Sequence, residues 1–333
     1  MSLVLKVKNS ASYIAEQAEN VSLNDEAIQD IANALTDAFH QQNLSPVSWS
    51  QHSLHPQPPL TNDIADWIFV LDSLNFSFWN DDLTPFTINY KGEHHKGYWA
   101  LCAALQRATD ENIPLFDAEF YSSIDEITLS HILRPSDPSV SIPMLRERTQ
   151  ILRENGKILL DKFNGSFLNV IRQAEGSAAK LVDLIVSNFP SFSDLSSYGG
   201  AKVYFLKRAQ ILVADLWACF EGREPFSFTD IDQLTMFADY RVPQILASLG
   251  ILEYSQELQH LLKKGELIPH GSSLEIEIRG CSIHAVEKIK QLLPGEVEVN
   301  AVLIDFYLWD LAKESCYLDE NEKLTHRTRT TFY

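Results

Sequence analysis

The residues best suited to chemistry lie in the stretch Thr235–Gln244, where an aspartate stands among aromatic rings and an arginine. Asp239 is followed two residues later by Arg241. Pro243 fixes its own φ and disfavours a helical conformation at Val242, so we expect this group at the boundary of an element. Such an aspartate is either a surface or helix-capping residue, or an active-site carboxylate tuned by rings and a cation. The local pattern leaves both interpretations open.

A second group of candidate residues is basic. Lys202, Lys207 and Arg208 lie within seven residues of sequence and follow the pair Gly199-Gly200. We expect a helix to begin after these glycines, and its free N–H groups and positive dipole end would favour a phosphate. The alternative is a solvated basic surface.

Two further groups combine aromatic rings with acidic side chains. Phe76 belongs to an aromatic run, which is either core or a wall on which a planar ligand stacks. A later apolar helix carries Asp305, Trp309 and Asp310. Asp305 and Trp309 share a face because they are four residues apart, whereas Asp310 points about 140° away from Asp305. At most one of the two aspartates can therefore face a given pocket.

The overall charge limits the kinds of partner. The chain has 333 residues, a formal net charge of -18 and an isoelectric point of about 4.9. Duplex DNA and long RNA require a basic surface, and anionic membranes repel an acidic one. We therefore expect no polynucleotide and no membrane as partner, although one phosphate can still bind in a local basic pocket.

Cysteine usage and the N-terminus predict an intracellular protein. The cysteines are far apart and form no metal-binding spacing, so we expect reduced, mostly buried thiols and no metal at Cys102, Cys219, Cys281 and Cys316. The N-terminus lacks the apolar region of a signal peptide, and the longest apolar run is broken by Asp215, which needs a partner. We expect a soluble monomer in the cytoplasm or the nucleus.

The spacing of apolar residues predicts a mainly α-helical fold. Helices are expected where apolar residues recur three and four positions apart, at residues 27–39, 64–75, 100–109, 123–133, 144–163, 177–188, 203–220, 244–249 and 301–312. Ser10 or Ser12 is expected to cap a first helix, and residues 22–24 a second. Residues 42–63 are expected to form an ordered loop.

One small β-hairpin is expected within this helical chain. Residues 86–90 alternate, and Lys91–Gly97 can turn the chain back, with His94 and His95 as turn residues. Glu275–Cys281 also alternates briefly, with a turn at Gly280 before a helix over residues 284–293. The chain contains no G-x-G-x-x-G, Walker A, HExxH or G-x-S-x-G motif, which argues against dinucleotide dehydrogenases, P-loop NTPases, zincins and α/β-hydrolases.

Several stretches taken together resemble one known family. They are Leu74–Trp79, Gly97–Ala104, Lys207–Asp215, Thr235–Gln244, Ile278–Cys281 and Tyr307–Asp310. They resemble, in order, the queuosine salvage family, whose members are called queuosine 5′-phosphate N-glycosylases/hydrolases, from about Ser10 to Tyr333. The resemblance implies hydrolysis of the N-glycosidic bond of a small-molecule partner, queuosine 5′-phosphate, with release of queuine for reuse in tRNA. The sequence shows no set of metal ligands, and we expect no cofactor. It also implies one helical domain over residues 1–333 that resembles DNA glycosylases; two packed lobes that divide near residues 190–200 are the alternative.

The resemblance suggests roles for the acidic residues. Asp239 is the expected catalytic residue, because a carboxylate near C1′ stabilises or attacks the oxocarbenium-like sugar. Arg241 would help to keep it ionised. Asp305 or Asp310 would accept hydrogen bonds from the N–H groups of the 7-deazaguanine base, and the match to the family favours Asp310.

The other expected site residues would hold the rest of the substrate. The spacing around the family's histidine differs in this chain, so His52 or His55 is the equivalent, with His52 preferred. The rings expected to stack on the base are Phe76, Phe237 and Trp309, and the cations expected at the 5′-phosphate are Lys202, Lys207 and Arg208.

Two other functions stay open at this stage. A DNA-type base glycosylase is opposed by the acidic composition and would excise bases from duplex DNA. A non-catalytic queuine- or nucleotide-binding protein would retain queuosine 5′-phosphate without cleaving it.

Overall fold

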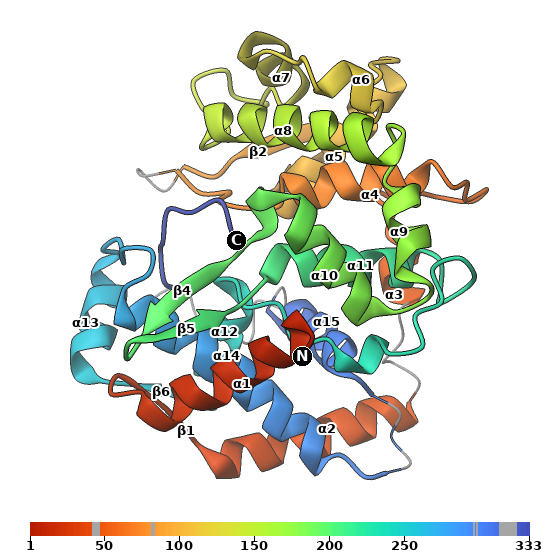
Figure 1. Ribbon diagram of the computed structural model, residues 1–333. Helices are drawn as coiled ribbons and strands as arrows, with labels where there is room; N and C mark the ends of the chain where they lie inside the picture. The colour runs from red at the N-terminus through yellow and green to blue at the C-terminus, as the bar shows by residue number, and fades with distance from the viewer. Residues whose placement is uncertain (42–46, 81–83, 296, 298, 313–324) are drawn as a thin grey trace.

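Helices make up most of the computed structural model, which describes residues 1–41, 47–80, 84–295, 297, 299–312 and 325–333 (Figure 1). The mainly α-helical fold predicted from the apolar spacing is confirmed. The α-helices are α1 (Leu3–Gln17), α2 (Asp25–His40), α3 (Val47–Ser50), α4 (Ile64–Ser73), α5 (Tyr98–Asp110), α6 (Ala118–Tyr121), α7 (Glu126–Ile132), α8 (Leu145–Phe163), α9 (Leu168–Ala174), α10 (Ala178–Asn188), α11 (Lys207–Cys219), α12 (Arg241–Ser248), α13 (Gln256–Lys264), α14 (Ser273–Leu292) and α15 (Ala301–Leu311). Two short 3-10 helices, η1 (Pro190–Phe192) and η2 (Ile231–Gln233), join them.

The strands in the described residues form three separate antiparallel pairs rather than the single hairpin expected. These are β1 (Val21–Leu23) with β6 (Leu252–Tyr254), β2 (Thr87–Tyr90) with β3 (Glu93–Lys96), and β4 (Leu195–Tyr198) with β5 (Ala201–Tyr204). The expected hairpin is β2–β3. Its turn is Lys91-Gly92, where both residues have positive φ, as a two-residue hairpin turn requires, and His94 and His95 lie in β3 instead.

The glycine pair Gly199-Gly200 does not open a helix. It forms the turn between β4 and β5, and α11 begins only at Lys207. The backbone N–H of Lys207 donates to Asp194 Oδ2 at 3.3 Å, so a carboxylate of the chain already lies at this helix N-terminus. The predicted phosphate site at the glycines is therefore wrong, because a hairpin intervenes between the glycines and the helix.

Helix α14 is continuous where a short strand and a turn were expected. Glu275 and Glu277 are both buried, so the alternation of acidic and apolar residues does not mark an exposed face. Gly280 lies in the middle of this helix, where α1 packs against it. A Cβ at this position would lie 2.6 Å from Ile14 Cγ2, so glycine is what allows the two helices to approach so closely.

The helix caps also differ in part from expectation. Ser2, not Ser10 or Ser12, caps α1, since its side chain accepts from the Leu5 N–H. Ser10 is buried within the helix, and its hydroxyl accepts from the Tyr204 N–H on β5. Asn24 caps α2 within the stretch that was expected to do so.

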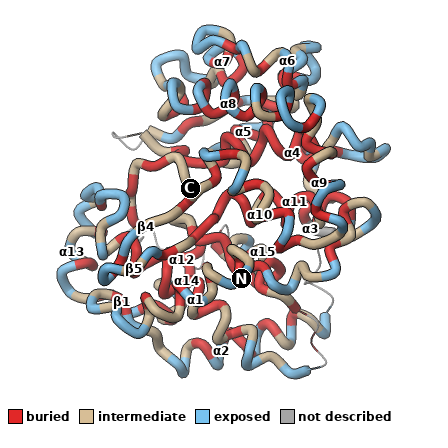
Figure 2. Tube along the Cα trace, viewed as in Figure 1, coloured by how far each residue is buried: buried red, intermediate tan, exposed pale blue. Residues whose placement is uncertain are grey.

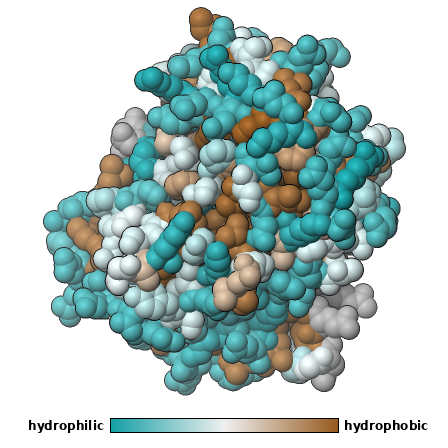
Figure 3. All heavy atoms as spheres, viewed as in Figure 1, coloured by the Kyte–Doolittle hydropathy of each residue, from teal (hydrophilic) through white to brown (hydrophobic). Residues whose placement is uncertain are grey.

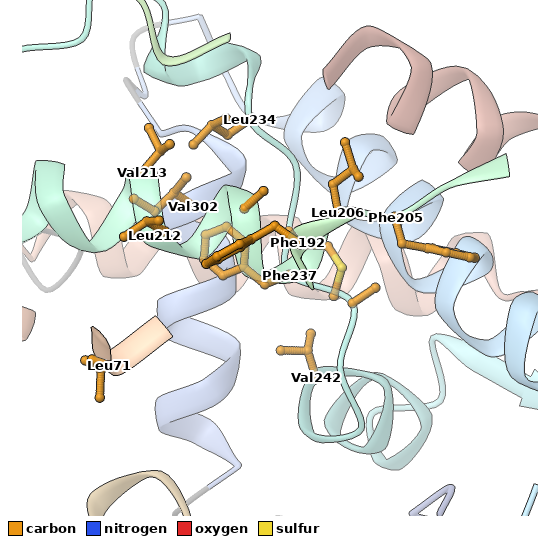
Figure 4. Packing of buried hydrophobic residues seen from close by; sticks show 14 of the residues in the cluster. Leu71, Phe192, Phe205, Leu206, Leu212, Val213, Leu234, Phe237, Val242 and Val302 are labelled. Carbon is orange, nitrogen blue, oxygen red and sulfur yellow. The ribbon is translucent and has the colours of Figure 1, made fainter. Parts of the chain in front are cut away.

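Helices α11 and α15 place side chains at the centre of the molecule. Helix α11 packs against α4, α10 and α3, and α15 packs against α12 and α14. Buried residues concentrate on α4, α5 and α11, whereas exposed ones are frequent on α7 and α13 (Figure 2). Phe237, in the segment before α12, belongs to the same buried hydrophobic cluster as Leu71 of α4, Leu212 and Val213 of α11 and Val302 of α15 (Figure 4).

The surface agrees with the acidic composition. The face in Figure 3 is mostly hydrophilic, with hydrophobic side chains only in small groups. None of the helices in the described ranges is both long and apolar enough to cross a membrane. Cys102, Cys219 and Cys281 are buried free thiols, whereas Cys316 lies outside the described residues.

Candidate active site

A cavity of about 570 Å³ brings together side chains that are far apart in the sequence. Its walls come from α3 and the loop after it, the start of α5, one face of α11, the segment before α12, and α15. The predicted site residues that line it are His52, Lys207, Phe237, Asp239, Arg241, Asp305, Trp309 and Asp310. Its volume, aromatic walls and few polar groups are typical of a small-molecule site.

Asp239 is a helix-capping residue and a cavity residue at once. Its Oδ1 accepts hydrogen bonds from the N–H groups of Arg241 at 2.7 Å and Val242 at 3.2 Å, which begin α12. Val242 is helical, contrary to expectation, because Pro243 falls in the first turn, where a missing N–H costs no hydrogen bond. No hydrogen bond reaches Oδ2 from the described residues. One oxygen is thus fixed by the backbone and the other is available to a ligand.

Lys207 is a buried cation among carboxyl groups. Its Nζ lies 3.5 Å from the carbonyl oxygen of Asn75. Burial lowers the pKa of Lys207, while the negative charges of Asp239, Asp72 and Asp305 act in the opposite direction. The Lys207 ammonium therefore lies close enough to Asp239 for the two charges to attract each other.

Asp305 connects α15 to the segment that carries Asp239. Its Oδ2 accepts from the Phe237 N–H at 2.9 Å. Burial raises the pKa of Asp305 well above its usual range, which favours the neutral acid, a group that can both donate and accept. Asp310 also lines the cavity, although it is exposed. The expectation that at most one of the two aspartates can face a given pocket is therefore wrong, because the cavity extends around more than one side of α15.

The other end of the cavity is built from aromatic rings, most of which sequence reasoning missed. Both histidine candidates lie here: His52 stacks on Trp99 with ring centroids 3.4 Å apart, and His55 stacks on Trp49 at 3.7 Å. His55 Nε2 is also hydrogen-bonded to the Tyr98 hydroxyl at 2.8 Å. These rings come from segments about 45 residues apart in sequence, and Trp49 lies in α3, a short helix within the region expected to be a loop, so no local pattern indicated that they meet.

Three predicted site residues do not line the cavity. Phe76 is buried between the guanidinium groups of Arg148 and Arg208, at 4.2 and 5.2 Å from its ring. Arg208 is fully buried and donates to the carbonyl oxygens of Ser73, at 2.7 Å, and of residues 72 and 191. Lys202 is exposed on β5, with its ammonium 5.4 Å from the Tyr204 ring.

The basic cluster is therefore split by the fold. Lys202 belongs to a hairpin, and Lys207 and Arg208 are adjacent residues on a helix, so their side chains leave α11 in different directions. Of these three, only Lys207 reaches the cavity. The cations that line it among the described residues are Lys96, Lys207 and Arg241.

Arg279 holds the backbone next to Asp239. Its Nε donates to the carbonyl oxygen of Ala238 at 2.9 Å, and its Nη1 and Nη2 contact Asp194 at 3.1 and 2.6 Å. Nη1 also lies 3.3 Å from Glu275 Oε1, which accepts from the Tyr333 hydroxyl at 2.9 Å. The guanidinium lies close to the rings of Phe205 and Tyr333, at 4.1 and 4.2 Å.

Electrostatics favours the charged form of this network. Burial acts to raise the pKa of Glu275, but the hydrogen bond with His270 and the charge of Arg279 outweigh it and lower that pKa to about 2. The charges of Asp194 and Glu275 likewise outweigh burial and raise the pKa of Arg279. The fully buried guanidinium is thus charged and paired with two carboxylates.

Fold and cavity together define a mainly helical protein with a small-molecule site that contains carboxyl groups. Comparison with known proteins makes this specific. The family model described as queuosine salvage protein matches residues 54–333. The chain belongs to the queuosine salvage protein family.

Relatives from distant organisms are similar over nearly their whole length. The queuosine 5′-phosphate N-glycosylase/hydrolase of Nematostella vectensis is 44% identical, over 99% of this chain and 99% of the relative. The proteins of the same name from Bos taurus and Sphaerobacter thermophilus are 42% and 39% identical, over 99% of this chain and 99% and 98% of their own lengths.

Removing the Arg279 guanidinium should be strongly destabilising. Arg279→Met leaves two buried carboxylates without their cation, and we expect the free energy of unfolding to fall by about 3–5 kcal/mol. Chemical denaturation measures this directly. Lys180→Met is the control, because Lys180 pairs with Glu175 at the exposed surface and its loss should leave the denaturation midpoint unchanged. An Arg279→Met protein as stable as the wild type would contradict the role given to this network.

Proposed function

We propose that this chain hydrolyses the N-glycosidic bond of queuosine 5′-phosphate and releases queuine. The relatives' names supply the substrate and the reaction. The observation that carries the proposal for this chain is the geometry of Asp239. Its carboxylate lines the cavity, has one oxygen held by two backbone N–H groups, and keeps the other available.

The reaction needs negative charge next to the sugar. As the C1′–N bond breaks, its electron pair leaves with the base and positive charge develops on the ribose ring. The available Asp239 oxygen stabilises that charge electrostatically. Water supplies the hydroxyl that C1′ gains, and its remaining proton balances the released base. Because the base is a 7-deazaguanine without the N7 that purine hydrolases protonate, stabilisation on the sugar side carries more of the barrier.

Asp305 is the better placed of the two candidates for the edge of the base. The edge presents N1–H and a 2-amino group, both donors, to an acceptor inside the cavity. Asp305 is buried and bonded to the backbone at Phe237, whereas Asp310 is exposed. Phe237 and Trp309, which line the same cavity, are the rings proposed to pack against the base.

Lys207 and Arg241 are proposed to face the 5′-phosphate. Both line the cavity, and Arg241 follows Asp239 closely at the start of α12. The Arg241 guanidinium hydrogen-bonds to Gln244 Oε1 at 3.0 Å, which orients it. Charge-assisted hydrogen bonds from these cations would distinguish the nucleotide from the nucleoside.

Asp239→Asn tests the catalytic role. Asparagine keeps an oxygen that can cap α12 but removes the negative charge, so we expect turnover of queuosine 5′-phosphate to fall by at least ~10²-fold while binding stays within about tenfold. Mass spectrometry of released queuine measures turnover. The control is Asp161→Asn on the exposed side of α8, which should retain full activity. Near-normal turnover by the Asp239→Asn enzyme would defeat the proposal, and tight binding without turnover by the wild type would favour a binding protein.

Arg241→Ala tests the phosphate contact. We expect it to lower kcat/KM for queuosine 5′-phosphate by at least ~10-fold more than for unphosphorylated queuosine, because a buried charge-assisted hydrogen bond is lost. Lys202→Ala removes a cation that does not line the cavity and should change both values less than about twofold. Equal losses for nucleotide and nucleoside on Arg241→Ala would remove this residue from the phosphate site.

A further inference from the structure

Asp215 is a further acidic residue that lines the cavity. It lies on α11 four residues after Ile211, which itself follows Lys207 by four, and all three line the cavity. The spacing places them along one face of the helix, with Asp215 about 12 Å further along the axis than Lys207. One wall of the cavity thus carries a cation at one end and an acid at the other.

The carboxyl group of Asp215 is buried without a hydrogen-bond partner. The residue is 1% exposed, and neither Oδ1 nor Oδ2 has a hydrogen bond of ordinary geometry among the described residues. Burial raises the pKa of Asp215 well above its usual range. The nearby Trp49 side chain lowers this pKa, but its effect is smaller than that of burial. Burying an acid without hydrogen-bond partners costs free energy. Buried acids of this kind are found at functional sites, where a bound ligand supplies the missing hydrogen bonds.

The surroundings of Asp215 suit an alkylammonium group. The rings of Trp49, Tyr98 and Trp309 line the same cavity, and α3, which carries Trp49, packs against α11. Tyr98 and Trp309 meet edge to face with centroids 6.0 Å apart. A carboxylate beside aromatic faces is the combination that recognises alkylated ammonium ions in proteins.

We infer that Asp215 accepts hydrogen bonds from the secondary ammonium of the substrate's side chain, an inference that rests on the proposed function. Queuosine carries at C7 an aminomethyl group whose nitrogen bears a cyclopentenediol. This secondary amine is protonated near neutral pH and offers two N–H donors. Its positive charge favours the ionised form of Asp215, whose two oxygens can then accept both hydrogen bonds. Asp215 is thereby a specificity residue, since 7-deazaguanosine without the side chain has nothing to place there.

The base edge is a less suitable partner for Asp215. Asp305 lies on α15 and accepts from the Phe237 N–H, in the segment that carries Asp239, which suits the proposed contact with that edge. The C7 substituent leaves the five-membered ring, away from N1–H and the 2-amino group, so a separate acid on α11 can meet the side chain while Asp305 meets the edge.

Three nucleotides test the inference with purified protein. They are queuosine 5′-phosphate, 7-aminomethyl-7-deazaguanosine 5′-phosphate, which keeps the amine without the diol, and 7-deazaguanosine 5′-phosphate, which lacks both. Asp215→Asn should lower kcat/KM by at least ~30-fold for the first two and by less than about threefold for the third. Because the native carboxyl is unpaired, the variant's Tm should not fall.

Asp72→Asn is the matched control. Asp72 is equally buried and lies near the same cation, but it accepts from Asn75 Nδ2 and does not line the cavity. Its substitution should affect the three nucleotides equally. Equal losses on Asp215→Asn, or a loss confined to the substrate with the diol, would overturn the inference.

Binding measurements separate this inference from the proposed function. If the wild type cleaves none of the nucleotides, the proposed function fails, yet the wild type should still bind queuine at least ~10-fold more tightly than 7-deazaguanine. The same comparison applies if Asp215→Asn does not fold. Equal affinities of the wild type for the two bases would overturn the role of Asp215 independently of catalysis.

Discussion

The buried guanidinium of Arg279 is the constraint on which the geometry of the cavity depends. It ties together four parts of the chain: α14, the Asp194 segment before β4, the Ala238 carbonyl and, through Glu275, Tyr333. A charge with no access to water must keep its partners, so these segments cannot shift independently. Asp239 follows directly after the backbone group that Arg279 holds, and its own oxygen is fixed by α12. The carboxylate is therefore positioned by the backbone on both sides.

Polar groups inside the cavity follow a consistent division. Those bonded to the protein position other residues: Asp305 holds the Phe237 N–H, and Asp239 Oδ1 holds the start of α12. Asp239 Oδ2 and the Asp215 carboxyl accept no hydrogen bond of ordinary geometry from the described residues, and these groups are proposed to meet the sugar and the side chain of the substrate. Asp239 is half-buried, whereas Asp215 is buried, and bound substrate can offset the free-energy cost of burying Asp215.

The sequence predicted those features that depend on local spacing. The β2–β3 hairpin and most of the long helices follow from strand and helix periods alone, whereas the helix period wrongly excluded one of Asp305 and Asp310 from the cavity that both line. The cluster of cations in the sequence wrongly predicted Lys202 and Arg208 as site residues. Lys202 lies on β5, and Arg208 leaves α11 in a different direction from its neighbour Lys207, so neither lines the cavity. Asp215 was recognisable as an acid that needed a partner. Its position in the cavity required α3 and α5, whose packing against α11 no local pattern encodes.

The most direct test of the central claim is a crystal structure of the Asp239→Asn protein with intact queuosine 5′-phosphate bound. The account predicts the substrate inside the cavity, with C1′ within about 3.5 Å of the residue 239 side chain, the distance at which a reacting group acts. A structure with the sugar bound elsewhere, or with C1′ turned away from residue 239 towards another group, would contradict it.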